Sequence, residues 1–291
     1  MRPLIQLLEK ELIEYRIVVK LPLFIALFAV LNFALVMSGD NVSFFVQTSG
    51  AGEWGFNLAS TGFANYVGKI NELVAGFVFL LLFIVYIPKT LRKERNEGSL
   101  MFWRAVPVSD YLAIAAKLLF ALVVIPLITS MLLLFSDGLV WLLAKWWMTN
   151  DIMASFSITF PAMFWHWLSF IGRVVMISLS LLPLACLLLF VSQLINYPMV
   201  AVVVTVIATK VMAYILLGSS AVGDFMSDIY SLPLTILTNE NPLEAYLSLG
   251  VVTHLVLLLI SAILFYLCSK QRSTDDRIFS HLVRNLYRAQ S

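Results

Sequence analysis

The residues of this sequence that could do chemistry are few and scattered, which argues against a catalytic centre. The three histidines, His166, His254 and His281, lie far apart, and the chain contains neither an H-E-x-x-H zinc motif nor a G-x-S-x-G nucleophile motif. Cys186 and Cys268 both fall in apolar runs, so we expect buried small hydrophobes and not a disulfide or a redox pair. The sequence therefore predicts no catalytic residues, no metal ligands and no enzyme activity.

A nucleotide-binding loop is missing as well. The nearest approach to a phosphate loop has five residues between Gly62 and Gly68 where the motif has four. Ile70 follows Lys69 where the motif requires Ser or Thr. We therefore expect no bound cofactor in this chain. The formal net charge of +2 gives no reason to expect nucleic acid as a partner.

The polar chemistry of the chain is concentrated in one segment, residues 89–117, which we call the island. It holds six of the nineteen Lys and Arg residues of a chain that is 61% hydrophobic and only 12% charged. In its middle, residues 100–104 read LMFWR, which puts four large apolar side chains beside the charges. These side chains either lie on the membrane surface, where Trp is favoured, or fill a hydrophobic groove on a cytoplasmic partner.

Six apolar segments surround the island and are long enough to cross a bilayer, which takes roughly 20 residues. The mean hydropathy of the chain is +0.93. Because backbone polar groups in lipid must be satisfied internally, we expect these segments to be helices. The sequence therefore predicts an all-α polytopic membrane protein with one transmembrane domain, 21–268, whose spans are 21–38, 72–88, 111–135, 163–190, 199–217 and 248–268.

The positions of Lys and Arg predict the orientation of these spans. Four lie in the N-terminal segment 1–20, six in the island and five in the tail 269–291, whereas only Lys69 and Lys145 fall in the loops of the opposite side. Because basic residues favour the cytoplasmic side, we expect both termini and the island to be cytoplasmic. The predicted location is the inner or plasma membrane, with the first span as an uncleaved anchor.

Two further helices are expected outside the spans. Residues 4–19 have the spacing of an amphipathic helix, although Glu11 intrudes on its apolar face. Such a helix lies in the headgroup plane, either as a simple anchor or as an elbow that touches a cytoplasmic partner. In the segment 218–247, apolar residues at helical spacing predict a short helix that dips back into the outer leaflet or lies at the interface.

Charged residues within the predicted spans are costly, at roughly 2.5–3.5 kcal/mol each at mid-bilayer, and need an explanation. Arg173 and Lys210 are such residues. One reading is a structural ion pair with Asp137, at the outer end of the third span. The other is a basic lining of the translocation pathway that attracts an anionic or amphiphilic cargo. His166 lies among three aromatic residues, and we read it as part of an interfacial belt.

Local signals divide the island into parts. Pro88 is expected to close the second span, and residues 90–104 have helical propensity with a break at Gly98. Ser109 or Asp110 is expected to cap the third span. The predicted loop between the two spans is 89–110, with a short helix inside it.

The island resembles the corresponding loop of ABC-2 type exporter permeases. Glu97, Gly98, Ser99 and Leu100 match the first element of that pattern, residues 106–109 match its L-P-V-S element with Val106 in place of the usual Leu, and Lys117 matches the K-x-L entry to the third span. Six spans, cytoplasmic termini and an amphipathic N-terminal helix agree with the family over nearly the whole chain.

The resemblance implies the type V ABC exporter fold. Two six-span permeases form a homodimer, and each binds a separate cytoplasmic ATPase subunit that holds ATP and Mg. The cargo would be a lipid, glycan, peptide or hydrophobic drug. The alternatives are a non-transporting scaffold or sensor docked to a cytoplasmic protein, and a membrane-embedded transferase. Under the resemblance the residues that couple to the ATPase are Arg92, Lys93, Glu94, Arg95, Glu97, Gly98, Ser99, Leu100, Trp103 and Arg104.

Overall fold

The computed structural model describes residues 2–38, 63–64, 66–96, 109–218 and 220–273, and within these ranges every regular element is a helix. Six helical stretches are long and apolar enough to span a membrane, which confirms the prediction of a multi-span all-helical protein. The helices are α1 (Arg2–Glu14), α2 (Ile17–Ser38), α3 (Tyr66–Asn96), α5 (Asp110–Leu119), η1 (Phe120–Val124), α6 (Ile125–Trp147), α7 (Asn150–Ser155), α8 (Phe160–Leu194), α9 (Pro198–Leu217), α10 (Ala221–Thr238), α11 (Pro242–Leu247) and α12 (Val251–Ser273).

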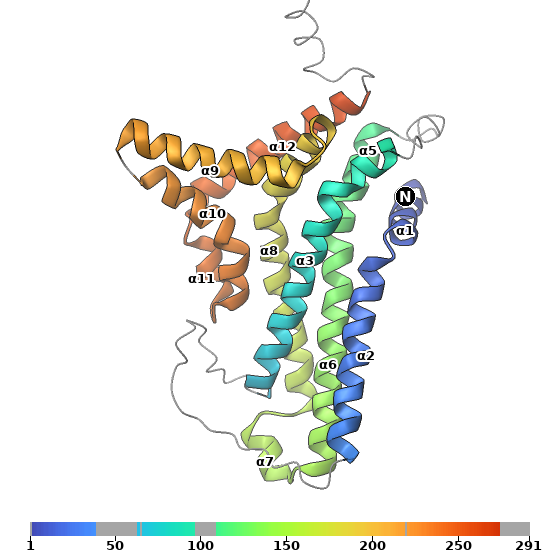
Figure 1. Ribbon diagram of the computed structural model, residues 1–291. Helices are drawn as coiled ribbons and strands as arrows, with labels where there is room; N and C mark the ends of the chain where they lie inside the picture. Colours follow the sequence, from blue (N-terminus) through green and yellow to red (C-terminus); the bar gives the residue numbers. More distant parts are fainter. Residues whose placement is uncertain (1, 39–62, 65, 97–108, 219, 274–291) are drawn as a thin grey trace, which may run out of the picture.

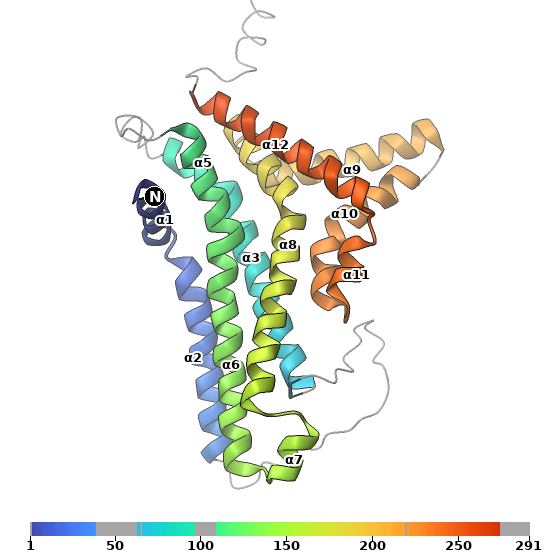
Figure 2. The same ribbon diagram turned by 180° about the vertical axis from the view of Figure 1, so that it is seen from behind.

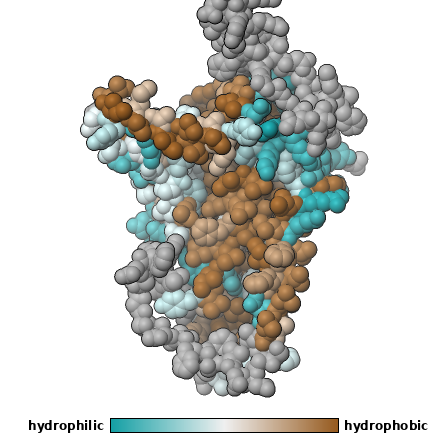
Figure 3. Space-filling view, in the orientation of Figure 1, coloured by the Kyte–Doolittle hydropathy of each residue, from teal (hydrophilic) through white to brown (hydrophobic). Residues whose placement is uncertain are grey.

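Four long helical rods form a bundle: α2, α3, the continuous α5–η1–α6 and α8 (Figures 1 and 2). Large side chains fill its interior, among them Phe79, Phe83, Tyr86, Phe120 and Phe170, each at most 1% exposed. The outward surface is also apolar, as Figure 3 shows over the length of the bundle, with hydrophilic residues gathered toward α1. Helices that are apolar on all sides are those expected in a lipid environment.

The helices α9 and α12 are arranged differently from the bundle. Both views show α9 lying across the bundle direction and α12 slanting across it, with α10 and α11 below them on the α9 side of the bundle (Figures 1 and 2). Few residues of α9 and α12 are buried. This part of the molecule joins the bundle through contacts of α8 with α10 and α12. Figure 1 also shows α1, the start of α5 and the end of α12 at one end of the molecule, with α7 at the other.

Helix α3 differs from the predicted span 72–88 at both ends. It begins at Tyr66 and passes through Pro88 to Asn96, so the expectation that Pro88 closes the span is wrong. Proline removes one helical hydrogen bond, but packing on both sides of it can hold the helix together. Thr90 and Leu91, which follow Pro88, are buried and supply that packing. Because α3 begins at Tyr66, Lys69, which was predicted to lie in an outer loop, is part of this helix.

The predicted third span, 111–135, is the longer rod Asp110–Trp147. Ser109 caps its first turn by accepting a 3.3 Å hydrogen bond from the backbone N–H of Leu112, as predicted. The π-helical turn η1 precedes Pro126, and the N–H of Ile125 donates to the carbonyl of Phe120. Such wider turns occur within α-helices, and this one allows the rod to continue past a proline that lacks an N–H.

The predicted N-terminal helix, 4–19, is interrupted. Helix α1 ends at Glu14 and α2 starts at Ile17. Residues 17–19, predicted as the end of the amphipathic helix, are therefore the first residues of the spanning helix α2. Tyr15 and Val18, at and after the break, are both buried. The direction change at this point carries α1 away from the axis of α2, as Figure 1 shows.

Candidate functional site: two buried polar networks and an apolar cavity

The first network joins α1 to the helices on either side of the island loop, and we call it the island network. It is built around Glu11, whose carboxylate accepts hydrogen bonds from Lys117 Nζ at 2.6 Å, from the Tyr86 hydroxyl at 2.8 Å and from the Thr90 hydroxyl at 3.2 Å. Lys117 Nζ also donates to Thr90 Oγ1 at 3.0 Å. Glu11 and Lys117 are each 2% exposed.

These contacts explain the acidic residue on the apolar face of α1. A buried carboxylate needs a counter-ion and hydrogen-bond donors, and Glu11 has both. Lys117 comes from α5, and Tyr86 and Thr90 come from α3. The residue that sequence reasoning treated as a flaw in the amphipathic pattern is therefore the joint between three helices. The signal in the sequence that could have indicated this contact was the single charge of Glu11 on the otherwise apolar face of α1.

Lys93, a predicted ATPase-coupling residue, faces α1 in the structure. Its Nζ lies 3.3 Å from Glu14 Oε1 and 5.1 Å from the centre of the Tyr15 ring. The Tyr15 ring in turn meets the Tyr86 ring edge-on, with their centres 4.8 Å apart. Lys93 thus extends the island network toward the surface.

Arg92, also near the end of α3, contacts a different part of the molecule. Its guanidinium donates to the backbone carbonyl of Asn196 and lies over the Tyr197 ring, 5.5 Å from the ring centre. These residues form the connection between α8 and α9. Of the other predicted coupling residues, Glu94 and Arg95 belong to α3 by their backbone. The rest, Glu97, Gly98, Ser99, Leu100, Trp103 and Arg104, lie outside the described residues.

The second network lies inside the bundle, and we call it the bundle network. Glu72 is at its centre: its Oε1 lies 2.6 Å from Arg173 Nε, and its Oε2 lies 3.0 Å from Lys69 Nζ. The His166 imidazole links Glu72 to Asp137, with Nε2 3.8 Å from Glu72 Oε2 and Nδ1 2.8 Å from Asp137 Oδ2. These five residues come from α3, α6 and α8. The Asn71 amide donates to the other oxygen of Asp137 at 3.0 Å.

Arg173 also caps the end of α10. Its Nη1 donates to the backbone carbonyls of Ile236 at 2.6 Å, Leu237 at 3.2 Å and Asn239 at 2.5 Å, and Nη2 donates to that of Glu240 at 3.4 Å. The last carbonyls of a helix have no partner within it and carry the negative end of the helix dipole. One guanidinium thus neutralises Glu72 and satisfies the end of α10.

The predicted pairing of Arg173 with Asp137 is wrong. Asp137 is fully buried and pairs with His166 and Asn71, while Glu72 takes Arg173. The error follows from the predicted start of the second span, which left Lys69 in an outer loop and put Glu72 at the first residue of the span. The His166 imidazole, predicted only as part of an interfacial belt, contacts the two carboxylates. No sequence motif marked these five residues as a group.

Lys210 does not join Arg173. Its Nζ donates to the Ser227 hydroxyl near the beginning of α10, whereas Arg173 binds the end of that helix. The aliphatic part of Lys210 runs along α10, since a Cβ atom built on Gly223 would lie 3.6 Å from Lys210 Cγ. Within the described ranges, no carboxylate lies within ion-pair distance of Lys210. Of the two predicted intramembrane cations, Arg173 thus has a carboxylate partner within the described residues, whereas Lys210 has a hydroxyl partner there.

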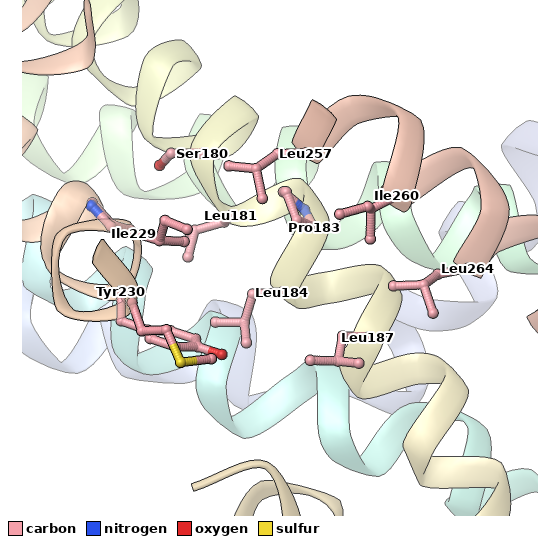
Figure 4. A pocket seen from close by; sticks show the side chains of 12 residues that line it. Ser180, Leu181, Pro183, Leu184, Leu187, Ile229, Tyr230, Leu257, Ile260 and Leu264 are labelled. Atoms are coloured by element: carbon pink, nitrogen blue, oxygen red, sulfur yellow. The ribbon is translucent and has the colours of Figure 1, made fainter. Parts of the chain in front are cut away.

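An apolar cavity of about 220 Å³ separates α8, α10 and α12. Figure 4 shows side chains from the three helices around it. Pro183 of α8 and Pro233 of α10 both line it, and proline loosens a helix by removing a hydrogen bond and adding bulk against the preceding turn. The full lining is Ser180, Leu181, Pro183, Leu184, Leu187, Met226, Ile229, Tyr230, Pro233, Leu257, Ile260 and Leu264.

Within the part of the chain that the structure describes, no three His, Cys, Asp or Glu side chains are arranged to hold a metal ion. In comparisons with known proteins, no family model, no curated protein and no solved structure matches this chain. Function therefore has to be inferred from the motif in the island and from the geometry of the networks and the cavity.

Proposed function

We propose that the chain is the membrane-spanning permease subunit of an ATP-driven exporter of the ABC-2 type. Two copies form a homodimer in the inner or plasma membrane with their termini in the cytoplasm. Each copy binds a cytoplasmic ATPase subunit, which holds ATP and Mg. The motif at residues 97–109, the distribution of Lys and Arg and the six apolar helices support this proposal.

The observation that carries the proposal is the island network. Residues 97–108 connect α3 to α5, and Glu11 fixes both of these helices to α1 through buried hydrogen bonds. A loop attached to loose helix ends would absorb a push from a partner, whereas a loop attached to a buried joint passes the push to the helices. The geometry therefore suits an element that transmits movement.

The same helices lead away from the joint to the bundle network. From Thr90 to Glu72, α3 is continuous and spans about 27 Å at 1.5 Å per residue. At Glu72 it meets Arg173 and the end of α10. In the proposed mechanism, ATP binding closes the two ATPase subunits, the island moves, and α3 carries the displacement to the contact with α10.

The cargo is proposed as a class only. The cavity between α8, α10 and α12 is apolar, and so is the outward face of the bundle (Figure 3). Among lipids, glycans, peptides and hydrophobic drugs, this lining favours molecules with a substantial apolar part.

Reconstitution with a defined ATPase tests the proposal. The chain is co-expressed with an ATP-binding subunit encoded beside it, and ATP hydrolysis by the purified complex is measured in lipid nanodiscs. We expect a stable complex, and we expect Trp103→Ala to weaken its assembly by about 2 kcal/mol or more, as for a buried aromatic anchor. Glu9→Ala, an exposed change on α1, serves as the control.

Two results would contradict the proposal. The first is a permease that never assembles with an ATP-binding subunit. The second is a complex whose hydrolysis does not respond to Glu97→Ala or Gly98→Ala, although the two subunits remain associated. Either result would favour a scaffold or sensor docked to another cytoplasmic protein.

A further inference from the structure

The size of the cavity between α8, α10 and α12 limits what it can hold. An engineered apolar cavity of about 150 Å³ takes up benzene and stays free of water. Pockets for drug-sized molecules begin at about 300 Å³. At about 220 Å³, this cavity is large enough for a segment of a hydrocarbon chain and too small to enclose a drug-sized molecule.

The lining selects hydrocarbon over water. None of the lining residues is charged, and the lining has two side-chain hydroxyls, those of Ser180 and Tyr230. The Ser180 hydroxyl already donates to the backbone carbonyl of Ile177, at 2.8 Å. Water in a cavity needs two to four polar partners, and ten of the twelve lining residues are apolar, so hydrocarbon is favoured over water. Two of the walls, α8 and α12, are candidate membrane spans, so the hydrocarbon within reach is the acyl chain of a bilayer lipid.

Lys210 supplies the second observation, which is independent of the cavity. Its ammonium group lies beside Ser227, and Ser227 is next in sequence to Met226, a lining residue of the cavity. A cation in an apolar helix is costly without a counter-ion, and the described part of the chain offers Lys210 only a hydroxyl. The position is thus suited to an anionic group that arrives with a ligand.

Two acidic residues of α10 restrict the kind of headgroup. Asp224 and Asp228 are exposed, and Asp224 accepts a hydrogen bond from the Ser220 hydroxyl at 2.8 Å. At 100° per residue they fall on the far side of Lys210 from the cavity. A headgroup that extends past Lys210 therefore meets two carboxylates, which disfavour further negative charge and favour an amine.

We propose that this region is a binding site for a phospholipid, with one acyl chain in the cavity and the phosphate on Lys210. The headgroup that fits best also carries an amine, as phosphatidylethanolamine does. The site does not depend on the exporter function. It is a property of the permease chain alone and can be tested without an ATPase.

Photolabelling of the full-length protein in nanodiscs tests the site. The probes are phosphatidylethanolamine and phosphatidylglycerol with a photoreactive acyl chain, and diacylglycerol with the same chain and no phosphate. We expect labelled peptides from α8, α10 and α12 with phosphatidylethanolamine, weaker labelling with phosphatidylglycerol and weakest with diacylglycerol. Equal labelling by all three probes, or labels spread evenly over the lipid-facing helices, would overturn the proposal.

Variants at adjacent positions on α12 provide a matched pair. Ile260→Trp fills the cavity and should remove the labelling, whereas Leu259→Trp, at a 63% exposed neighbour that does not line the cavity, should leave it unchanged. Ile260→Ala enlarges the cavity and should retain the labelling, which separates filling from misfolding. Equal labelling of the two Trp variants, both eluting as folded protein, would contradict the site.

A second matched pair of variants tests the contact between the phosphate and Lys210. Lys210→Gln should lower phosphatidylethanolamine retention, measured by native mass spectrometry, roughly tenfold, the effect of losing one charge-assisted hydrogen bond. Lys145→Gln, at an exposed lysine on α6, should not lower it. If Lys210→Gln retains the lipid fully, the assignment of the phosphate to Lys210 is wrong, and the cavity is not a phospholipid site.

Discussion

The island network and the bundle network are both buried and ionic, but they are built differently. In the island network all three donors to Glu11 are side chains, each from α3 or α5. In the bundle network Arg173 spreads its donors over Glu72 and four backbone carbonyls. The first depends on one carboxylate, and the second has several acceptors for one cation.

This difference predicts different responses to damage. Removing one member of a compact ion pair leaves an uncompensated buried charge, which costs about 3–5 kcal/mol. A cation with several backbone acceptors keeps most of its partners when one is lost. Hydrogen bonds between membrane helices average only about 0.6 kcal/mol, so the loss of one is a smaller effect. We therefore expect the island network to be a brittle joint, in which one substitution removes most of the stabilisation. We expect the bundle network to be a graded one, in which the loss depends on how many hydrogen bonds are removed.

The largest expected effect is that of Glu11→Ala. It removes the carboxylate that lies 2.6 Å from the Lys117 ammonium, and because breaking a buried ion pair costs about 3–5 kcal/mol, we expect a loss of that size in unfolding free energy. The measurement is chemical denaturation of the purified protein in detergent. Glu9→Ala, an exposed change on the same helix, should cost less than about 0.5 kcal/mol.

A double variant separates a lost ion pair from a lost helix contact. Glu11→Ala with Lys117→Met removes both charges, and it should recover more than half of the stability lost in Glu11→Ala alone, because replacing both members of a buried ion pair by apolar groups is far less costly than removing one. An equally unstable double variant would mean that Glu11 acts through packing or through the two hydroxyls. The comparison with the bundle network would then lose its basis.

An intermediate effect is expected for Arg173→Lys. The ammonium group keeps the positive charge near Glu72 but cannot reproduce the planar fork that reaches both the carboxylate and the end of α10. We expect a loss of about 1–3 kcal/mol, the cost of leaving buried acceptors unsatisfied. Hydrogen exchange should rise in α10 and remain unchanged in α1.

The reverse pattern is expected for Glu11→Ala, with faster exchange in α1 and little change in α10. Exchange that rises in both regions for both variants would show that the two networks form one cooperative unit. That outcome would remove the distinction between a brittle joint and a graded one, although each network would still contribute to stability.

The sequence predicted the fold class because apolar length alone carries that information. Span limits were less accurate, since Pro88 was read as a helix end and tertiary packing of Thr90 and Leu91 overrides it. The helix-capping role of Ser109 was predictable because its hydroxyl and the first turn are adjacent in sequence. Local signals thus succeeded wherever the interacting groups are local.

Both networks escaped prediction for the opposite reason. Glu11 and Lys117 are 106 residues apart, and Asn71 and Asp137 are 66 apart, so no spacing rule connects them. Arg173 was singled out correctly as a costly intramembrane charge, but its main acceptors are backbone carbonyls, which every residue has. A sequence pattern can mark a charge that needs partners without indicating which partners it finds.

The smallest effect on stability is expected for Lys93→Ala. Lys93 pairs with Glu14 at 3.3 Å, but its side chain is 32% exposed, and exposed pairs contribute about 0–1 kcal/mol. We therefore expect a change within that range in denaturation experiments.

If the island receives the ATPase, the same variant should lower ATP hydrolysis by the complex, because Lys93 lies at the α3 end that continues into the loop. Lys145→Ala, an exposed change on α6 outside the island, is the control. A variant that loses stability and activity in proportion would show that Lys93 serves the island network alone, whereas lost activity at full stability would place the docking surface on α3 itself.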